Sequence, residues 1–238
     1  MKPPAGETGG GAGWLLAGLA AGALGMLAVA FGLAGLFRET APRPAGAPRF
    51  VEETATAGVE HVYDGEFDFF VGGGVAVFDC DDDGRQDLFL AGGVNPAALY
   101  RNGSATGGAL RFTPEPDPVT GLTEVTGAYP IDVDGDGITD LAVLRHGENV
   151  MLRGVGDCRF ERANEAWAVD GGDEWTVGFS ATWEDEDALP TLAFGNYLAE
   201  DGQQTGQCAD HVMFRSAGAA YGDGISLRPG WCTLSLLF

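Results

Sequence analysis

Short apolar runs alternate with glycine-rich polar turns along most of the chain. In the clearest unit, strands are expected at about Gly74–Phe78, Asp87–Ala91, Ala97–Arg101 and Leu110–Thr113. Apolar runs of about four to six residues between turn signals are typical of β-strands. No sustained helical periodicity follows Phe37. The pattern therefore predicts an all-β fold.

An acidic turn between two apolar runs recurs within this pattern. Its three copies are "VFDCDDDGRQDLFL" (Val77–Leu90), "AYPIDVDGDGITDLAVL" (Ala128–Leu144) and "SATWEDEDALPTLAFG" (Ser180–Gly195). The residue before the turn is Phe78 in the first copy, Ile131 in the second and Thr182 in the third. The repeat unit is therefore about 50 residues long, which is the range of repeat architectures.

A second landmark recurs in phase with the acidic turn. In "ALYRNG", "VMLRGV" and "VMFRSA" an arginine follows two apolar residues, at Arg101, Arg153 and Arg215. Units of about 40–50 residues with four strands each are typical of β-propeller blades. We predict a partial propeller of about three four-stranded blades, in which the arginines serve blade geometry rather than partner contacts.

The last residues, "CTLSLLF" (Cys232–Phe238), look like the strand that enters a further acidic turn. A propeller needs about 4–8 blades to close its ring. The chain is therefore expected to be the N-terminal part of a longer propeller. The alternative is that this strand ends the native fold.

The segment Trp14–Phe37 has no charged residue. About 20 apolar residues cross a bilayer, whereas the apolar part of a signal peptide has about 7–15. This length favours an uncleaved transmembrane anchor, with a signal peptide cleaved near Ala28–Ala30 as the alternative; both export the rest of the chain. The expected organisation is a tail (1–13), this segment (14–37), a proline- and alanine-rich linker (38–49) and the propeller region (50–238).

The formal net charge of −22 restricts the choice of partners. Nucleic acid is excluded, because its phosphate backbone requires a basic protein face. Cations suit such a surface, and the charge also serves solubility.

The four cysteines would lie in an oxidising compartment, where disulfides persist. No CxxC motif or Cys/His cluster indicates zinc. Cys208 lies in an insertion of the third repeat and Cys232 begins the last expected strand, so we predict that these two pair; two free thiols are the alternative. The sequence does not decide the states of Cys80 and Cys158.

The first two acidic turns offer the oxygen ligands that Ca²⁺ prefers. Aspartates occupy the first, third, fifth and ninth positions, with a glycine at the sixth and a backbone carbonyl at the seventh. The predicted ligands are Asp79, Asp81, Asp83, the carbonyl of Arg85 and Asp87 in the first turn, and Asp132, Asp134, Asp136, the carbonyl of Ile138 and Asp140 in the second. Without a cation these carboxylates would repel one another. Calcium is the expected cofactor, and a solvated turn without metal is the alternative.

Two other calcium-binding architectures fit less well. An EF-hand needs a glutamate at position 12 and flanking helices, but Leu90 and Val143 stand there, between strand-like flanks. A calcium-rich β-solenoid has a repeat of about nine residues, far shorter than the unit seen in this chain.

The third acidic turn has lost much of this chemistry. Trp183 replaces the first aspartate, Ala188 the glycine and Thr191 the ninth-position aspartate, which leaves Asp185 and Asp187. We expect this turn to bind calcium weakly or not at all.

These motifs resemble the FG-GAP/VCBS repeats of integrin α-subunits and bacterial surface proteins, and most of all the cartilage acidic protein and ASPIC/UnbV family. The resemblance is carried by "FVEETATAGVEH" (Phe50–His61), "GGGVAVFDCDDDGRQDLFL" (Gly72–Leu90), "LYRNG" and "RPGWCTLSLLF". It implies a calcium-binding, seven-bladed propeller outside the cytoplasm that serves adhesion or protein interaction. The aspartates of the two intact turns are the ligands that it implies.

The favoured function is a calcium-stabilised, non-enzymatic binding module, tethered by its N-terminal segment, whose partner is an extracellular protein or glycan. The alternative is the propeller domain of a polysaccharide-acting lyase or hydrolase. His61, His146 and His211 are scattered and are expected at the surface or in turns, and Ser180 has no nucleophile motif around it. No catalytic constellation is visible, so the chain is not expected to be an enzyme.

Overall fold

The computed structural model describes residues 46–184, 187–199 and 206–238. Contacts divide the chain into two units, Met1–Val51 and Glu52–Phe238. Of the first unit, residues 46–51 are described and form no helix or strand. The predicted anchor or signal segment, Trp14–Phe37, lies outside the described residues. Among the residues that are described, no helix is both long and apolar enough to cross a membrane.

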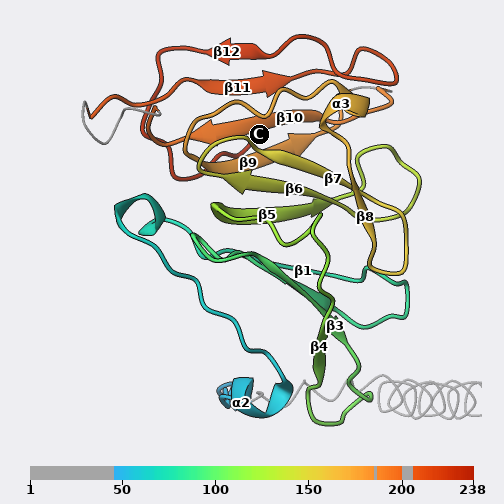
Figure 1. Cartoon of the computed structure of the whole chain (residues 1–238). Coiled ribbons are helices and arrows are strands. Elements are labelled where there is room, and N and C mark those ends of the chain that lie inside the picture. Colours follow the sequence, from blue (N-terminus) through green and yellow to red (C-terminus); the bar gives the residue numbers. More distant parts are fainter. Residues whose placement is uncertain (1–45, 185–186, 200–205) are drawn as a thin grey trace, which may run out of the picture. The chain divides into compact units, whose positions relative to one another are not determined.

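Within the described part of the second unit, strands form three four-stranded antiparallel sheets, each built from consecutive strands (Figure 1). Sheet I contains β1 (Val75–Phe78), β2 (Asp87–Leu90), β3 (Ala98–Asn102) and β4 (Phe112–Pro114). Sheet II contains β5 (Val125–Ile131), β6 (Asp140–Arg145), β7 (Val150–Gly154) and β8 (Phe160–Arg162). Sheet III contains β9 (Thr176–Thr182), β10 (Thr191–Asn196), β11 (His211–Phe214) and β12 (Ile225–Leu227). The predicted all-β class and four-stranded units are confirmed.

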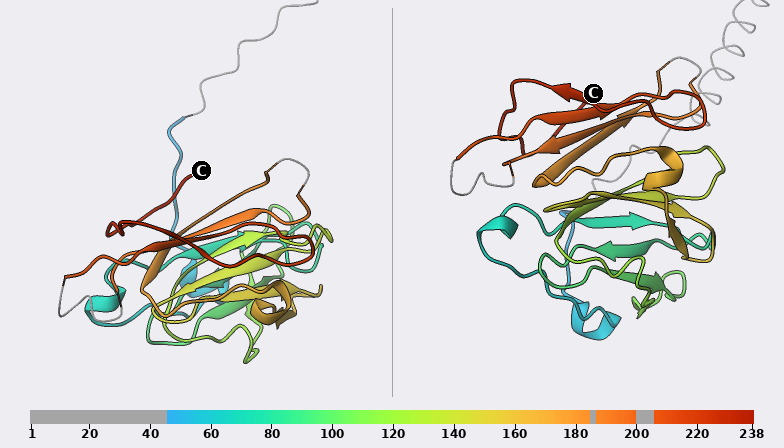
Figure 2. Two further views of the ribbon diagram at one scale, coloured as in Figure 1. Left: turned by 90° about the horizontal axis from the view of Figure 1, so that it is seen from above. Right: turned by 45° about the horizontal axis from the view of Figure 1, so that its top comes forward.

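Sheet II is buried on both faces. In β6, Leu141 and Val143 point into a core shared with sheet I, whereas Ala142 and Leu144 point into a core shared with sheet III. This division follows from the two-residue period of a strand, which sends alternate side chains to opposite faces. In β1, by contrast, only every second side chain is buried. Figure 2 shows the sheets stacked in chain order, with sheet II between the other two.

Large apolar side chains fill both cores. The core between sheets I and II includes Phe78, Phe89, Leu99, Leu152 and Phe160. The core between sheets II and III includes Met151, Phe179, Leu192, Phe194 and Phe214. The strands that supply each core come from adjacent repeats, so no single repeat encloses its own core.

Among the described residues of the second unit, the helical elements are short. They are α2 (Thr54–Ala57), the 3₁₀ turn η1 (Phe67–Phe69) and α3 (Asn164–Trp167). The segment around η1 leads into sheet I, yet Phe67 and Phe70 place their rings 5.9 and 6.0 Å from that of Trp175, beside β9 in sheet III. This segment therefore links the first sheet to the third.

The prediction of a final strand at Cys232–Phe238 is wrong, because no strand forms there. The segment lies against sheet III, where the backbone N–H of Thr233 donates to the carbonyl of Asn196 and that of Phe238 donates to the Ser180 hydroxyl. A strand requires a ladder of backbone bonds with a neighbour, and these two bonds are isolated. The disulfide between Cys208 and Cys232 ties the beginning of the segment to the chain before β11.

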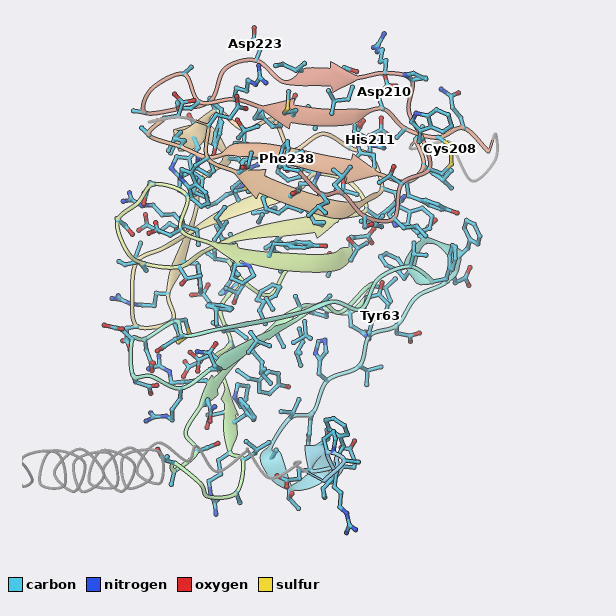
Figure 3. The ribbon with its side chains drawn as sticks, turned by 180° about the vertical axis from the view of Figure 1, so that it is seen from behind. Tyr63, Cys208, Asp210, His211, Asp223 and Phe238 are labelled. Carbon is cyan, nitrogen blue, oxygen red and sulfur yellow. A yellow bond between two sulfur atoms is a disulfide. The ribbon has the colours of Figure 1, made fainter. Side chains whose placement is uncertain are left out.

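His211 also differs from the expectation of a surface or turn histidine. It begins β11 and is buried, and Figure 3 shows it at the same end of sheet III as Cys208 and Asp210. Its Nδ1 accepts the backbone N–H of Asn196 at 3.2 Å, and its Nε2 lies 3.0 Å from the hydroxyl of Thr233. A neutral ring satisfies both contacts, so burial is tolerated.

This burial predicts a pH dependence of stability. Burial lowers the pKa of His211 below its ordinary value of 6.5, while the carboxylate of Asp210 acts in the opposite direction. At His211 the unfolded state therefore binds more protons than the folded state, so the contribution of this residue to stability should fall as the pH drops below about 6.5 towards the folded pKa. We expect His211→Asn to reduce this fall, as measured by urea unfolding at pH 7.5 and pH 5.5. An unchanged pH dependence in the variant would exclude this role for His211.

Candidate metal centres

The two intact acidic turns occupy the same place in their sheets. The first connects β1 to β2 and is closed by the pair Phe78 and Asp87, and the second connects β5 to β6 and is closed by Ile131 and Asp140. Each turn is therefore the tip of a hairpin, and the ninth-position aspartate is the first residue of the returning strand. Both turns are therefore closed at the same position of their hairpins.

The ninth-position aspartates are buried and bonded to backbone. Asp87 and Asp140 are 1% and 0% exposed. Both oxygens of Asp87 accept backbone N–H groups, from Cys80 at 2.9 Å and Asn102 at 2.7 Å. These bonds fasten the turn to the third strand of the sheet.

Asp140 makes the equivalent bonds in the second turn. It accepts the N–H groups of Val133 at 2.7 Å and Gly154 at 2.8 Å. Burial raises the pKa of Asp140 to about 6, and the two N–H bonds act against this rise. The sequence predicted these aspartates only as ligands, and the structure adds a role in holding the turn.

The first-position aspartates hold the sharp bend of each turn. Asp79 accepts the backbone N–H of Gly84 at 2.7 Å, and Asp132 accepts that of Gly137 at 3.0 Å. Both glycines have positive φ values, 81° and 84°, in the left-handed region that side chains with a Cβ rarely adopt. This explains the glycine at the sixth position.

Three carboxylates converge in each turn. Ligand oxygens of Asp79, Asp81 and Asp87 lie within 4.8 Å of one another in the first turn, and those of Asp132, Asp134 and Asp136 do so in the second. Two predicted ligands stand apart from these groups. Asp83 forms an ion pair with the guanidinium of Arg85. Asp140 lies outside the second group, although Asp87, which makes the equivalent backbone bonds, belongs to the first.

The two carbonyl ligands, of Arg85 and Ile138, lie in the same turns as these groups. The N–H of Arg85 donates to Asp83 at 2.9 Å, and that of Ile138 donates to Asp136 at 2.8 Å. That the carbonyl oxygens of Arg85 and Ile138 are calcium ligands stays a prediction.

One carboxylate oxygen in each turn is buried without a hydrogen-bond partner in the described part of the chain. These atoms are Oδ1 of Asp81 and Oδ1 of Asp132. Burial, together with the nearby carboxylates of Asp83 and Asp87, raises the pKa of Asp81. Unsatisfied buried carboxylate oxygens are costly, and a bound cation would remove that cost. The donor set, made of oxygens alone, fits a hard divalent cation such as Ca²⁺.

The repeated arginines contact the acidic turns. Arg101 places Nη1 3.0 Å from Oδ2 of Asp81, and Arg153 places Nε 2.9 Å from Oδ2 of Asp134. Each arginine thus orients the third-position aspartate of its own sheet. Both landmarks could be identified from the sequence, but their contact was missed; their similar separation in the first two repeats was the signal that could have revealed it.

The third turn also has an arginine in contact with an acidic side chain, but the side chains differ. Arg215 places Nε 3.1 Å from Oε1 of Glu184, and the same oxygen accepts the hydroxyl of Thr191 at 2.7 Å. Trp183 stands in the first position and is exposed. Of the two remaining aspartates, Asp185 lies outside the described residues. The weak or absent calcium binding expected here stays a prediction.

Two disulfides are present, between Cys80 and Cys158 and between Cys208 and Cys232. The second joins the two cysteines expected to pair. The first joins the acidic turn of sheet I to the turn between β7 and β8 in sheet II. The backbone N–H of Cys158 also donates to the carbonyl of Cys80 at 3.0 Å. This link lies within the candidate metal centre, because Cys80 stands between Asp79 and Asp81.

These observations define a class of protein, namely an all-β chain of repeated four-stranded sheets whose first hairpins carry acidic turns. Residues 79–143 match the family described as FG-GAP-like repeat. The matched residues include both intact acidic turns. No curated protein sequence matches the chain.

Proposed function

We propose that the unit Glu52–Phe238 is part of a β-propeller that binds Ca²⁺ in its two intact acidic turns and acts as a non-enzymatic interaction module. The three stacked sheets, each an antiparallel meander of four strands, support the propeller. The FG-GAP-like match supports a role in interaction. We also propose that the chain is a member of the cartilage acidic protein and ASPIC/UnbV family.

The single observation that carries calcium binding is the pair of buried carboxylate oxygens, one in each turn, that have no hydrogen-bond partner among the described residues. The residues that would hold the ion are Asp79, Asp81 and Asp87 in the first turn and Asp132, Asp134 and Asp136 in the second. The carbonyls of Arg85 and Ile138 would add a ligand to each. When bound, the ion would neutralise like charges at the tip of each hairpin. Its role is therefore structural.

The proposed location is outside the cytoplasm, with a protein or glycan as partner. Two disulfides support this location, because disulfides persist in oxidising compartments. The segment Trp14–Phe37 would provide the membrane anchor or export signal.

Calcium should raise the thermal stability of the protein. A ligand that binds only the folded state at 100 times its dissociation constant adds about 2.7 kcal/mol per site. We expect calorimetry to show two bound ions, and Asp79→Asn and Asp132→Asn each to remove one. In Asp132→Asn the remaining oxygen can still accept the N–H of Gly137, whereas Asp79→Asn keeps an acceptor for only one of the two N–H groups, of Asp83 and Gly84, that bond to Asp79.

The matched control is Asp170→Asn, which changes an exposed acid outside the acidic turns. It should keep both ions and the full stabilisation. The proposal is wrong if calcium leaves unfolding unchanged in the unaltered protein, or if the turn variants respond to calcium as the control does.

A further inference from the structure

We propose that the Cys80–Cys158 disulfide holds the first acidic turn in its calcium-binding shape, so that this turn is a redox-sensitive calcium site and the second is not. The inference rests on the proposed function, because it concerns the affinity of one of the two calcium turns.

The disulfide is attached at the centre of the first turn. Cys80 stands between Asp79 and Asp81, and its backbone N–H donates to Asp87 at 2.9 Å. These are the three aspartates whose oxygens converge. A displacement of the Cys80 backbone would therefore move all three.

The partner turn, around Cys158, holds the same group by a second route. Arg101 places Nη1 between Oδ2 of Asp81 at 3.0 Å and Oδ1 of Asp157 at 2.9 Å, and its Nη2 donates to the carbonyl of Asp157 at 3.0 Å. Asp157 immediately precedes Cys158. The disulfide thus keeps in place the residue that helps Arg101 to orient Asp81.

The partner turn is also conformationally strained. Asp157 and Cys158 have φ values of 54° and 56°, in the left-handed region that residues other than glycine occupy rarely. Such conformations persist only where the surroundings impose them. Without the disulfide, this turn can relax and withdraw its support from the first acidic turn.

The second acidic turn provides an internal comparison. Val133 stands where Cys80 stands in the first turn, and its N–H likewise donates to the ninth-position aspartate, Asp140. Arg153 orients Asp134 as Arg101 orients Asp81. The two turns share these contacts, but only the first is covalently fixed to a neighbouring sheet.

The consequence is a difference in preorganisation. Without calcium, repulsion between carboxylates favours an open turn, and the apparent dissociation constant rises as the binding-competent fraction falls. The disulfide limits this opening in the first turn only. By linkage, calcium must oppose reduction of the disulfide by the same factor by which the disulfide favours calcium.

The redox step is a thiol–disulfide exchange with a dithiol reductant such as dithiothreitol. The two thiols of the reductant give two electrons and two protons to the Cys80–Cys158 bond. This yields two cysteine thiols, while the reductant closes into a cyclic disulfide.

The experiment measures calcium affinity by calorimetry on the full chain in two backgrounds. Asp132→Asn leaves the first turn intact, and Asp79→Asn leaves the second. Into each we introduce Cys80→Ala/Cys158→Ala, with Cys208→Ala/Cys232→Ala as the control that removes the other disulfide. We expect the first pair of alanines to weaken calcium binding at least about fivefold in the Asp132→Asn background. No change is expected in the Asp79→Asn background or with the control pair.

Three results would overturn the inference. An equal loss in both backgrounds would show general loosening, and a loss with the control pair would show that any disulfide suffices. Unchanged affinity in the Asp132→Asn background would exclude the coupling while leaving calcium binding intact. Absence of calcium binding in the oxidised single variants and in the unaltered protein would overturn the proposed function itself. As a second readout, calcium should lower the extent of Cys80–Cys158 reduction at a given dithiothreitol ratio, judged by thiol labelling.

Discussion

Replacing Cys80 and Cys158 together by alanine should lower the free energy of unfolding by about 4 kcal/mol. The two cysteines are 78 residues apart, and a disulfide that closes a long loop removes more entropy from the unfolded chain than one that closes a short loop. This disulfide also joins sheets I and II at the tip of a hairpin. Urea unfolding of the oxidised proteins, at constant calcium, measures the loss.

The other disulfide provides the comparison for this measurement. Cys208 and Cys232 are 24 residues apart, so Cys208→Ala/Cys232→Ala should cost about 3 kcal/mol. Alanine is preferred to serine at position 80, because Asp87 Oδ2 lies 2.9 Å from Cys80 Sγ and would accept a serine hydroxyl. A smaller loss for the Cys80/Cys158 pair than for the Cys208/Cys232 pair would contradict its role as a clamp between the sheets.

The strands and the acidic turns could be predicted from the sequence because both depend on local pattern. The alternation of apolar and polar residues sets which side chains of a strand face the core. The glycines at positions 84 and 137 mark the left-handed bend that each turn requires. Each of these signals extends over fewer than about ten residues, so it is readable without knowledge of the neighbouring sheet.

Contacts between repeats could not be predicted in this way. The pairing of Cys80 with Cys158 depends on how sheet II stacks on sheet I, and the burial of His211 depends on the segment that follows β12. The second role of Asp87 was hidden for a related reason within its own sheet, because one of its partners, the N–H of Asn102, belongs to β3 and lies outside the local pattern of the turn. The final segment was misjudged because a strand pattern describes the chain alone, whereas a strand also requires a neighbour to pair with.

Trp175 contacts residues that precede or follow strands of all three sheets, so its removal should destabilise the packing of all three. It is fully buried, with ring centroids of Phe67, His146 and Tyr197 at 5.9, 6.0 and 5.0 Å. Phe67 belongs to the segment that enters sheet I, His146 follows β6 of sheet II, and Tyr197 follows β10 of sheet III. Trp175→Ala should therefore lower the free energy of unfolding by about 3–5 kcal/mol, the range for removing a large buried aromatic side chain.

Two further substitutions distinguish this role from a general sensitivity of tryptophan positions. Trp175→Phe keeps an aromatic ring and removes an indole N–H that has no hydrogen-bond partner in the described part of the chain, so it should cost less than Trp175→Ala. Trp231 is 70% exposed, and Trp231→Ala should change stability by no more than about 0.5 kcal/mol. Urea unfolding of the three variants measures these differences. Equal losses of unfolding free energy for Trp175→Ala and Trp231→Ala would show that the rings around Trp175 do not join the sheets. Trp231 is exposed and makes no such contact among the described residues.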